Sequence, residues 1–255
     1  MSTSATAQAR SAPAPAGALR AQTVAVIGAS AGIGLETARL ARAEGADIVL
    51  AARNPDPLER VSRALGAIHS AAFDATDPAA LEGFFGGLPG PVDHVMLTAG
   101  RPRYGPPSEL GHERAREALS EHQLLALEVA RLSASGVRRG GSIVLMGGTG
   151  ARRPRAGRVV ASAVTAALPA LTASLALELA PTRINLVAAG FVDTALSASI
   201  LGEELDARRA RLRETLPIGR VVGPQDVALL AVHLMVNTAL TGGTYDIDGG
   251  QQLVE

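Results

Sequence analysis

The strongest constraint on the fold is a repeating alternation between short apolar runs and longer segments with helical periodicity. The apolar runs are residues 24–27, 48–51, 94–97, 142–146, 184–187 and 244–247. The helical segments between them include residues 33–44, 79–85, 109–133, 159–179 and 224–235. Runs that are apolar throughout suit strands buried on both faces of a parallel sheet. The alternation therefore predicts an α/β fold, a doubly wound parallel sheet with helices on both faces.

The chain is predicted to form one domain that follows an N-terminal tail. Residues 1–20 are rich in Ala, Ser and Pro and contain no apolar block. Such a composition buries too little surface to offset the entropy of ordering, which predicts a flexible tail. Arg10, Pro13 and Pro15 interrupt any signal-peptide core, so we expect a cytoplasmic protein. No linker or repeat divides residues 21–255, which predicts a single Rossmann-like domain.

Composition excludes several classes of function. Acidic and basic residues number 24 each, and this zero net charge argues against a nucleic-acid-binding protein. The absence of cysteine excludes disulfides, a thiolate nucleophile and a cysteine-based metal site, and no metal is expected. The apolar stretches look shorter than a bilayer span and are broken by polar residues, so no membrane segment is expected. Every basic residue is arginine, which excludes any mechanism that needs a lysine.

A glycine-rich turn follows the first apolar run and opens the first helical segment. It reads Gly28-Ala29-Ser30-Ala31-Gly32-Ile33-Gly34. In a strand–turn–helix unit, such a turn brings the helix amides against a pyrophosphate, because glycine lets the backbone approach closely. The turn therefore predicts a dinucleotide cofactor, and a tight turn without a ligand is the alternative.

Arg53 follows the second apolar run, where dinucleotide sites often place an acidic residue. An arginine at this place accommodates a 2′-phosphate, so NADP(H) is preferred over NAD(H). A solvated surface charge is the alternative interpretation of Arg53.

Further motifs give the chain a family resemblance over residues 23–253. They are Phe73-Asp74-Ala75-Thr76-Asp77, Leu97-Thr98-Ala99-Gly100, Arg183-Ile184-Asn185, Gly190-Phe191-Val192-Asp193-Thr194 and residues 241–250. With the glycine turn, they resemble the short-chain dehydrogenase/reductase family. Two positions depart from its pattern, because Thr98 replaces an asparagine and Ala189 replaces a proline. The residues of the chain that this resemblance and the preceding motifs assign to the cofactor are Gly28, Ser30, Ala31, Gly32, Ile33, Gly34, Arg53, Asp74, Ala75, Ala99, Gly100, Gly190, Val192 and Thr194.

The family's catalytic residues, a serine and a Tyr-x-x-x-Lys motif, have no counterpart at the aligned positions. Gly148 aligns with the serine, Ala161 with the tyrosine and Thr165 with the lysine. In the family, the tyrosine protonates the forming alkoxide and the lysine assists it. The family's further asparagine aligns near Ser120, Glu121 or His122. The resemblance therefore implies a divergent member of the family.

Four residues are candidates for the missing chemistry. Tyr104 lies in the loop after the fourth strand of the family pattern and is a candidate proton donor. His122 is a second candidate donor near neutral pH. Thr149 and Thr165 are candidates to hold hydroxyl groups of ribose or substrate. Each has an ordinary alternative, as a loop anchor or as a helix residue without a function.

Three functional interpretations remain open. The first is an NADP(H)-dependent oxidoreductase of a carbonyl or imine substrate, in which another acid supplies the proton. The second is a non-catalytic NADP(H)-binding sensor or partner subunit. The third is a non-redox isomerase, dehydratase or cyclase that works by positioning.

The loop between the fifth strand of the family pattern and the next helix contains a cluster of arginines. Arg152, Arg153 and Arg155 are candidates to bind a carboxylate or phosphate of a small-molecule substrate. A solvated run of charges is the alternative.

The segment from residue 159 is apolar around almost its whole helical surface, which is more than one core-facing stripe requires. Members of the family commonly form tetramers, so we expect a homodimer or homotetramer.

Overall fold

The computed structural model describes residues 17–152 and 154–254 of the chain. Within them, seven strands form one parallel sheet in the order β3-β2-β1-β4-β5-β6-β7. The strands are β1 (Thr23–Ile27), β2 (Asp47–Ala52), β3 (His69–Ala72), β4 (Val92–Leu97), β5 (Val137–Gly148), β6 (Arg183–Ala189) and β7 (Thr244–Ile247). The predicted doubly wound α/β fold is confirmed.

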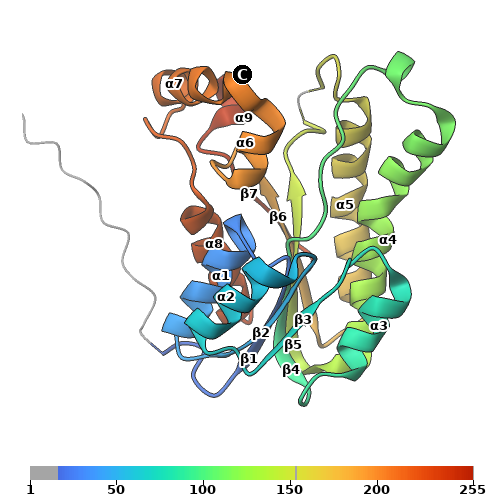
Figure 1. Ribbon diagram of the computed structural model, residues 1–255, viewed down its shortest axis with the longest axis vertical. Helices are drawn as coiled ribbons and strands as arrows, with labels where there is room; N and C mark the ends of the chain where they lie inside the picture. The colour runs from blue at the N-terminus through green and yellow to red at the C-terminus, as the bar shows by residue number, and fades with distance from the viewer. Residues whose placement is uncertain (1–16, 153, 255) are drawn as a thin grey trace, which may run out of the picture.

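Helices cover both faces of the sheet, as Figure 1 shows. One face carries α1 (Gly32–Ala43), α2 (Pro55–Leu65) and α8 (Pro224–Val236). The other carries α3 (Pro78–Gly86), α4 (His112–Gly136) and α5 (Val159–Glu178). The short elements are η1 (Pro107–Glu109), α6 (Ala195–Leu201), η2 (Gly202–Glu204), α7 (Leu205–Thr215) and α9 (Gln251–Val254). Of these, α6 and α7 lie above the carboxyl ends of the strands, where they form one wall of the site (Figure 1).

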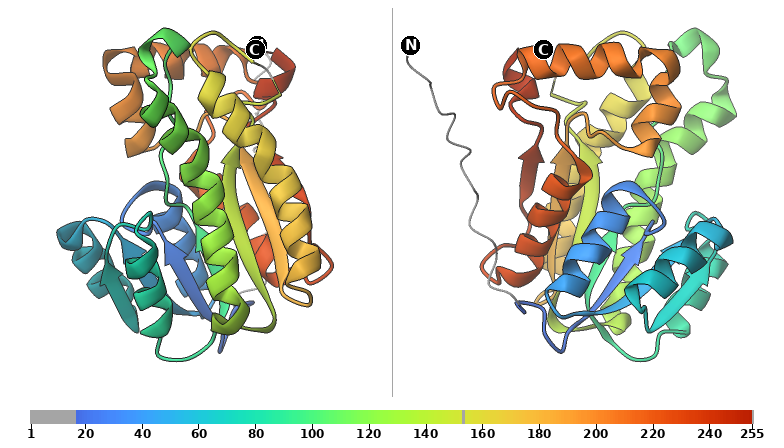
Figure 2. Two further views of the ribbon diagram at one scale, coloured as in Figure 1. Left: turned by 90° about the vertical axis from the view of Figure 1, so that its right-hand side faces the viewer. Right: turned by 60° about the vertical axis from the view of Figure 1, so that its left-hand side comes forward.

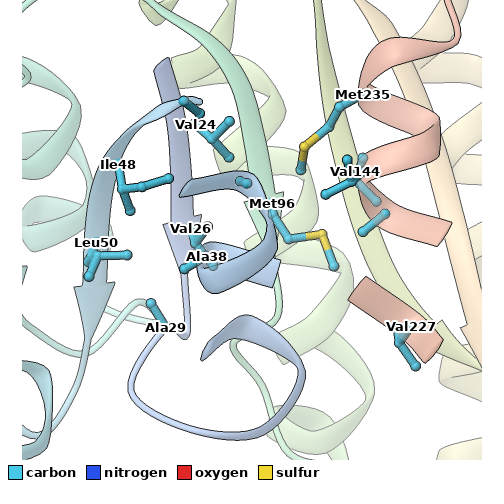
Figure 3. Packing of buried hydrophobic residues seen from close by; sticks show 14 of the residues in the cluster. Val24, Val26, Ala29, Ala38, Ile48, Leu50, Met96, Val144, Val227 and Met235 are labelled. Carbon is cyan, nitrogen blue, oxygen red and sulfur yellow. The ribbon is translucent and has the colours of Figure 1, made fainter. Parts of the chain in front are cut away.

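The core consists of two apolar layers, one on each face of the sheet. Side chains alternate along β1, so Val24 and Val26 join the layer under α1 and α8. Ala25 and Ile27 join the opposite layer under α4 and α5. Figure 3 shows part of the first layer, with Met96 among its labelled residues. Each fully buried large aliphatic side chain contributes about 1.5–3 kcal/mol of transfer free energy, so both faces stabilise the sheet edge that carries the site.

α5 corrects one expectation from the sequence. With 20 residues and a mean hydropathy of 1.8, it is long and apolar enough to cross a bilayer by length and composition alone. The expectation that no apolar stretch reaches this length was therefore wrong. In the structure, Val164, Leu168 and Leu175 of α5 are buried in the domain, and the helix contacts α4 and β6. One face of α5 thus packs on the domain, whereas Val159 and Leu177 are 50% and 83% exposed on the other side.

The sequence predicts that the folded domain begins at residue 21. In the structure, it begins earlier. The backbone amides of Gly17 and Ala18 donate to the carboxylate of Glu44, at 3.0 and 3.1 Å. Leu19 is fully buried, and its amide donates to the carbonyl of Glu44. Residues 17–20 are thus tied to the end of α1, and the remainder of the predicted tail, residues 1–16, lies outside the described residues.

Candidate functional site

Three adjoining pockets follow the carboxyl edge of the sheet. β2 pairs with one side of β1 and β4 with the other, so the strand order reverses direction there, and ligands of open α/β sheets bind at such a switch point. The Arg53 pocket has a volume of ≈ 700 Å³ and is lined by Arg53 and Asp74. The central pocket, ≈ 300 Å³, is lined by the glycine turn and His122. The Arg158 pocket, ≈ 450 Å³, is lined by Arg158, by residues of α6 and by Arg208 of α7.

The pockets share residues, so they form one connected site. Ala99 and Gly100 line both the Arg53 pocket and the central pocket. Ala161 and Thr165 line both the central pocket and the Arg158 pocket. A ligand that fills the first two pockets therefore ends beside the third.

The glycine turn has the geometry that a pyrophosphate requires. Gly28 has a φ of +101°, and a Cβ there would collide with Oγ1 of Thr98. A Cβ on Gly34 would collide with the carbonyl oxygen of Gly28. Thr98, which replaces the family's asparagine, donates to the carbonyls of Ile27 and Gly28, each at 3.1 Å, and so ties β4 to the turn. No side chain of the described residues caps the amino end of α1, whose amides can therefore donate to an anion.

The Arg53 pocket holds a cation and an anion close together. Asp74 accepts hydrogen bonds from the amide and hydroxyl of Thr76, at 3.0 and 2.8 Å. These bonds, with a smaller contribution from the positive charge of Arg53, hold the pKa of Asp74 below its usual value. Asp74 therefore stays ionised, while the exposed Arg53 presents its guanidinium to the pocket.

The three positions aligned with the family's catalytic residues meet where the central and Arg158 pockets join. Gly148, Ala161 and Thr165 line both pockets. A Cβ on Gly148 would lie 3.4 Å from Cγ2 of Thr165, so the two positions are neighbours. The Thr165 hydroxyl donates to the carbonyl of Ala161 at 2.8 Å. Its hydrogen is thus used within α5, which leaves its oxygen lone pairs to accept from a ligand.

His122 lines the central pocket from α4. A Cβ on Gly100 would lie 2.9 Å from Nε2 of His122, so the ring sits against the end of β4. Its Nδ1 is buried and has no hydrogen-bond partner among the described residues. Burial lowers the pKa of His122, which Glu121 opposes and Arg103 assists. The imidazole is therefore neutral at neutral pH.

Tyr104 and Thr149 border the same region. Tyr104 is half exposed and lines both the central and the Arg158 pockets. The guanidinium carbon of Arg158 lies 5.9 Å from the centre of its ring, within cation–π range. Thr149 lines the Arg158 pocket, and its amide donates to the carbonyl of Ala189 at 3.1 Å. All four residues that the sequence marked for chemistry thus border the site.

The residues predicted to bind the cofactor all border the Arg53 or central pocket. Those on the Arg53 pocket are Gly28, Ser30, Arg53, Asp74, Ala75, Ala99 and Gly100. Those on the central pocket are Gly28, Ala31, Gly32, Ile33, Gly34, Ala99, Gly100, Gly190, Val192 and Thr194. The structure therefore brings together residues that span most of the sequence.

Arginines of the loop between β5 and α5 differ in whether they line the site. Arg155 lines the Arg158 pocket, as predicted. Arg152 is not among the described residues that line it, because its guanidinium forms an ion pair with Asp246 on β7 and donates to the side chain of Gln252 at 3.3 Å. Arg153 lies outside the described residues. Arg208 on α7 also lines the pocket, although no sequence motif marks it.

Comparison with known proteins identifies the family. A family model described as enoyl-(acyl carrier protein) reductase matches residues 28–252. The short-chain dehydrogenase/reductase ATR9 of Stachybotrys chlorohalonatus is 30% identical over 247 residues, which cover 91% of this chain and 97% of that protein. The chain belongs to the short-chain dehydrogenase/reductase family. It is thus a member of a family of oxidoreductases that bind nicotinamide cofactors.

Solved structures of other short-chain dehydrogenases/reductases are similar over almost the whole chain. The MalC reductase/Diels-Alderase of Malbranchea aurantiaca has a TM-score of 0.85 and 25% identity, covering 93% of this chain and 98% of its own. A short-chain oxidoreductase of Pseudomonas aeruginosa PAO1, described as containing an atypical catalytic center, is NADPH-bound. It has a TM-score of 0.81 and 25% identity, covering 90% of this chain and 96% of its own.

Proposed function

We propose that this protein is an NADP(H)-dependent reductase of carbonyl or imine substrates, with an atypical active site that lacks Tyr-x-x-x-Lys. One observation carries the proposal. The glycine turn and Arg53 lie at one end of a connected site, and Gly148, Ala161 and Thr165 meet at its other end. The similarity to an NADPH-bound oxidoreductase with an atypical catalytic center supports it. A cytoplasmic location belongs to the same proposal.

Arg53 supports the preference for NADP(H). It lies at the end of β2, in the pocket that would take the adenosine half of a dinucleotide. A guanidinium there can bind a 2′-phosphate through two parallel hydrogen bonds. Asp74 accepts hydrogen bonds from Thr76. Its carboxylate therefore does not take the place of Arg53 at the ribose 2′ position.

The chain must supply a proton if the reaction is a reduction. The chemistry supplied by a bound reduced nicotinamide is hydride transfer to the carbonyl or imine carbon, which breaks its π bond onto oxygen or nitrogen. Protonation of that atom completes the product. Apart from arginine, Tyr104 and His122 are the titratable groups that line the central pocket within the described residues.

Tyr104 is the better donor at neutral pH. His122 has a lowered pKa and is mainly neutral there, whereas a donor imidazole must be protonated. The Tyr104 hydroxyl carries a proton to give, and the Arg158 guanidinium lies over its ring.

A deuterium-transfer experiment tests the proposal. The protein is incubated with NADPH deuterated at C4 of the nicotinamide and a panel of ketones, aldehydes and imines, and products are analysed by mass spectrometry. We expect deuterium in the product and matching NADPH consumption. Tyr104→Phe should lower kcat/KM by about 10²–10⁴-fold, the usual contribution of a general acid.

The pH profile separates the two donors. If His122 donates instead, the rate rises as pH falls toward its pKa below 6.5, and His122→Asn removes that rise. Loss of activity in Tyr104→Phe without a change in the acid limb supports Tyr104.

A non-redox activity is the second candidate. The observation that favours it is the absence of an acidic hydroxyl at positions 148, 161 and 165. The MalC protein, described as a reductase/Diels-Alderase, has a similar structure. This candidate predicts conversion of a substrate without NADPH consumption. NADPH binding with no conversion across the panel would instead favour the sensor or partner-subunit interpretation.

A further inference from the structure

The Arg158 pocket is lined by three cations and, among the described residues, by no carboxylate. Its cations are Arg155, Arg158 and Arg208. A hollow of ≈ 450 Å³ with arginine alone as its charged lining has a positive potential, which attracts anions.

The arginines come from opposite walls of the pocket. Arg155 and Arg158 belong to the loop before α5, whereas Arg208 belongs to α7. Figure 1 shows α7 and this loop on opposite sides of the carboxyl ends of β5 and β6. The first turn of α5 also borders the pocket and adds the positive end of a helix dipole. A ligand between the walls would therefore meet positive charge from both sides.

Two of the guanidinium groups lie against aromatic rings. Arg158 lies over Tyr104, and Arg208 lies over Phe191, each at 5.9 Å from the ring centre. Both rings line the same pocket. A cation–π contact limits the motion of a long side chain, and a guanidinium has five N–H donors at its edge to bind anionic oxygens. The pocket is thus preorganised for an anion with an apolar body.

Three carboxylates close to the pocket in sequence are partnered by other groups. Asp193 accepts from Arg209 at 2.7 and 2.9 Å, on the side of α7 next to Arg208. Asp246 pairs with Arg152. Asp248 accepts from the amides of Gly250 and Gln252 and from the Gln252 side chain. These carboxylates are therefore partnered by groups other than Arg155 and Arg158.

We propose that the Arg158 pocket binds an anionic group, a carboxylate or a phosphate, of the substrate. This inference rests on the proposed function, because Ala161 and Thr165 connect the pocket to the central pocket. A substrate anchored by Arg158 and Arg208 extends its uncharged carbonyl end toward that junction. The substrate class is then a carbonyl compound with a negatively charged tail.

Three matched aldehydes test the proposal by isothermal titration of the cofactor-free protein at low ionic strength. They are 4-formylbenzoate, its neutral methyl ester and 4-formylphenyl phosphate, which share one ring and one carbonyl. We expect at least one anion to bind about tenfold or more tightly than the ester, as a charged hydrogen bond contributes. The preferred anion distinguishes a carboxylate substrate from a phosphate substrate.

Arginine variants locate the binding. Arg158→Gln and Arg208→Gln should each remove most of the preference for the anion. Arg155 is exposed, so Arg155→Gln leaves the packing unchanged. It should weaken the binding of the anions by a smaller factor than Arg158→Gln or Arg208→Gln does. Arg139→Gln removes the same charge at the start of β5 and is the matched control, with no expected change. Arg53→Ala tests whether the phosphate aldehyde binds in the Arg53 pocket instead, and its affinity should not change in this variant.

Equal affinities for ester and anions, or a preference that survives Arg158→Gln and Arg208→Gln, would overturn the proposal. Failure of this proposal can be distinguished from failure of the proposed function, which a separate NADPH titration tests. Anion preference without NADPH binding overturns the reductase but supports the anion pocket. NADPH binding without anion preference overturns the pocket alone.

Discussion

His94 is a buried residue whose protonation the fold controls. Its Nδ1 lies 2.8 Å from the Ser142 hydroxyl, and its Nε2 lies 2.6 Å from Oε1 of Gln22. A carbonyl oxygen only accepts, so Nε2 donates to Gln22 and Nδ1 accepts from Ser142. Burial, with a contribution from Arg183, lowers the pKa of His94 to about 4. The sheet therefore holds this imidazole in its neutral form.

This pKa predicts a loss of stability in mild acid. In the unfolded chain, histidine titrates near 6.5, so below that pH the unfolded state binds a proton that folded His94 does not accept until about pH 4. The free energy of unfolding therefore falls as pH decreases from about 6.5 to about 4. The fall from this group is about 2 kcal/mol between pH 7.5 and 5. Urea denaturation at both pH values measures it.

His94→Gln provides the comparison, since it removes the titrating group. The variant should lose less stability than the wild type between the two pH values. An identical loss in both proteins would show that His94 does not control this step.

Some residues of the candidate site can be predicted from the sequence and others cannot. The glycine turn and Arg53 were predictable because local order alone places them at the end of a strand. Arg208 was not, because a charged stretch of a helix resembles any solvated surface, and only the fold brings α7 over the end of β6. The ion pair of Arg152 was not predictable for a related reason, since its partner Asp246 is distant in sequence.

At the scale of elements, the hydrogen bonds of a buried arginine join α8 to the sheet. Arg183 at the start of β6 is 7% exposed and donates to four carbonyls at the end of α8 and just after it. These are the carbonyls of Leu234, Met235, Asn237 and Leu240, at 2.6 to 3.2 Å. Helix ends leave such carbonyls without partners, so one guanidinium satisfies several of them.

Replacing this arginine should destabilise the protein. Arg183→Met leaves buried carbonyls unsatisfied, and we expect the free energy of unfolding to fall by about 3 kcal/mol. Chemical denaturation measures the change. Arg139→Met, which removes an exposed arginine of β5, should change it by less than about 0.5 kcal/mol. A comparable effect in both variants would contradict the role of Arg183.

The elements differ in how well the sequence predicts them. Six strands and five helices follow from apolar runs and helical periodicity, with ends that shift by a few residues. β3 was missed because its sequence, His-Ser-Ala-Ala, has no large apolar side chain and lies at the sheet edge, where every second residue is exposed. α6 and α7 were missed because they cover the edge of the sheet and carry few buried side chains.

At the scale of the whole molecule, α4 and α5 form an apolar outer face. The two helices lie side by side in Figure 2. Leu119, Leu124 and Leu127 of α4 are 42–56% exposed, and Leu177 of α5 is 83% exposed. We propose that a second copy of the chain covers this face in a homodimer or homotetramer.

Light scattering after size-exclusion chromatography tests the assembly. The wild type should elute with the mass of two or four chains, and Leu124→Glu should reduce that mass by placing a charge in the interface. Leu253→Glu, at an exposed leucine of α9, is the control. A wild type with the mass of one chain would contradict the proposal.

The central claim is that the Arg53 and central pockets bind NADP(H). Fluorescence titration with NADPH and NADH tests it most directly, because the chain has no tryptophan to interfere with nicotinamide emission. We predict tighter binding of NADPH, and Arg53→Ala should weaken NADPH about tenfold while leaving NADH unchanged. Arg60→Ala on α2 should change neither affinity. Failure to bind either nucleotide, or equal weakening of both by Arg53→Ala, would contradict the account.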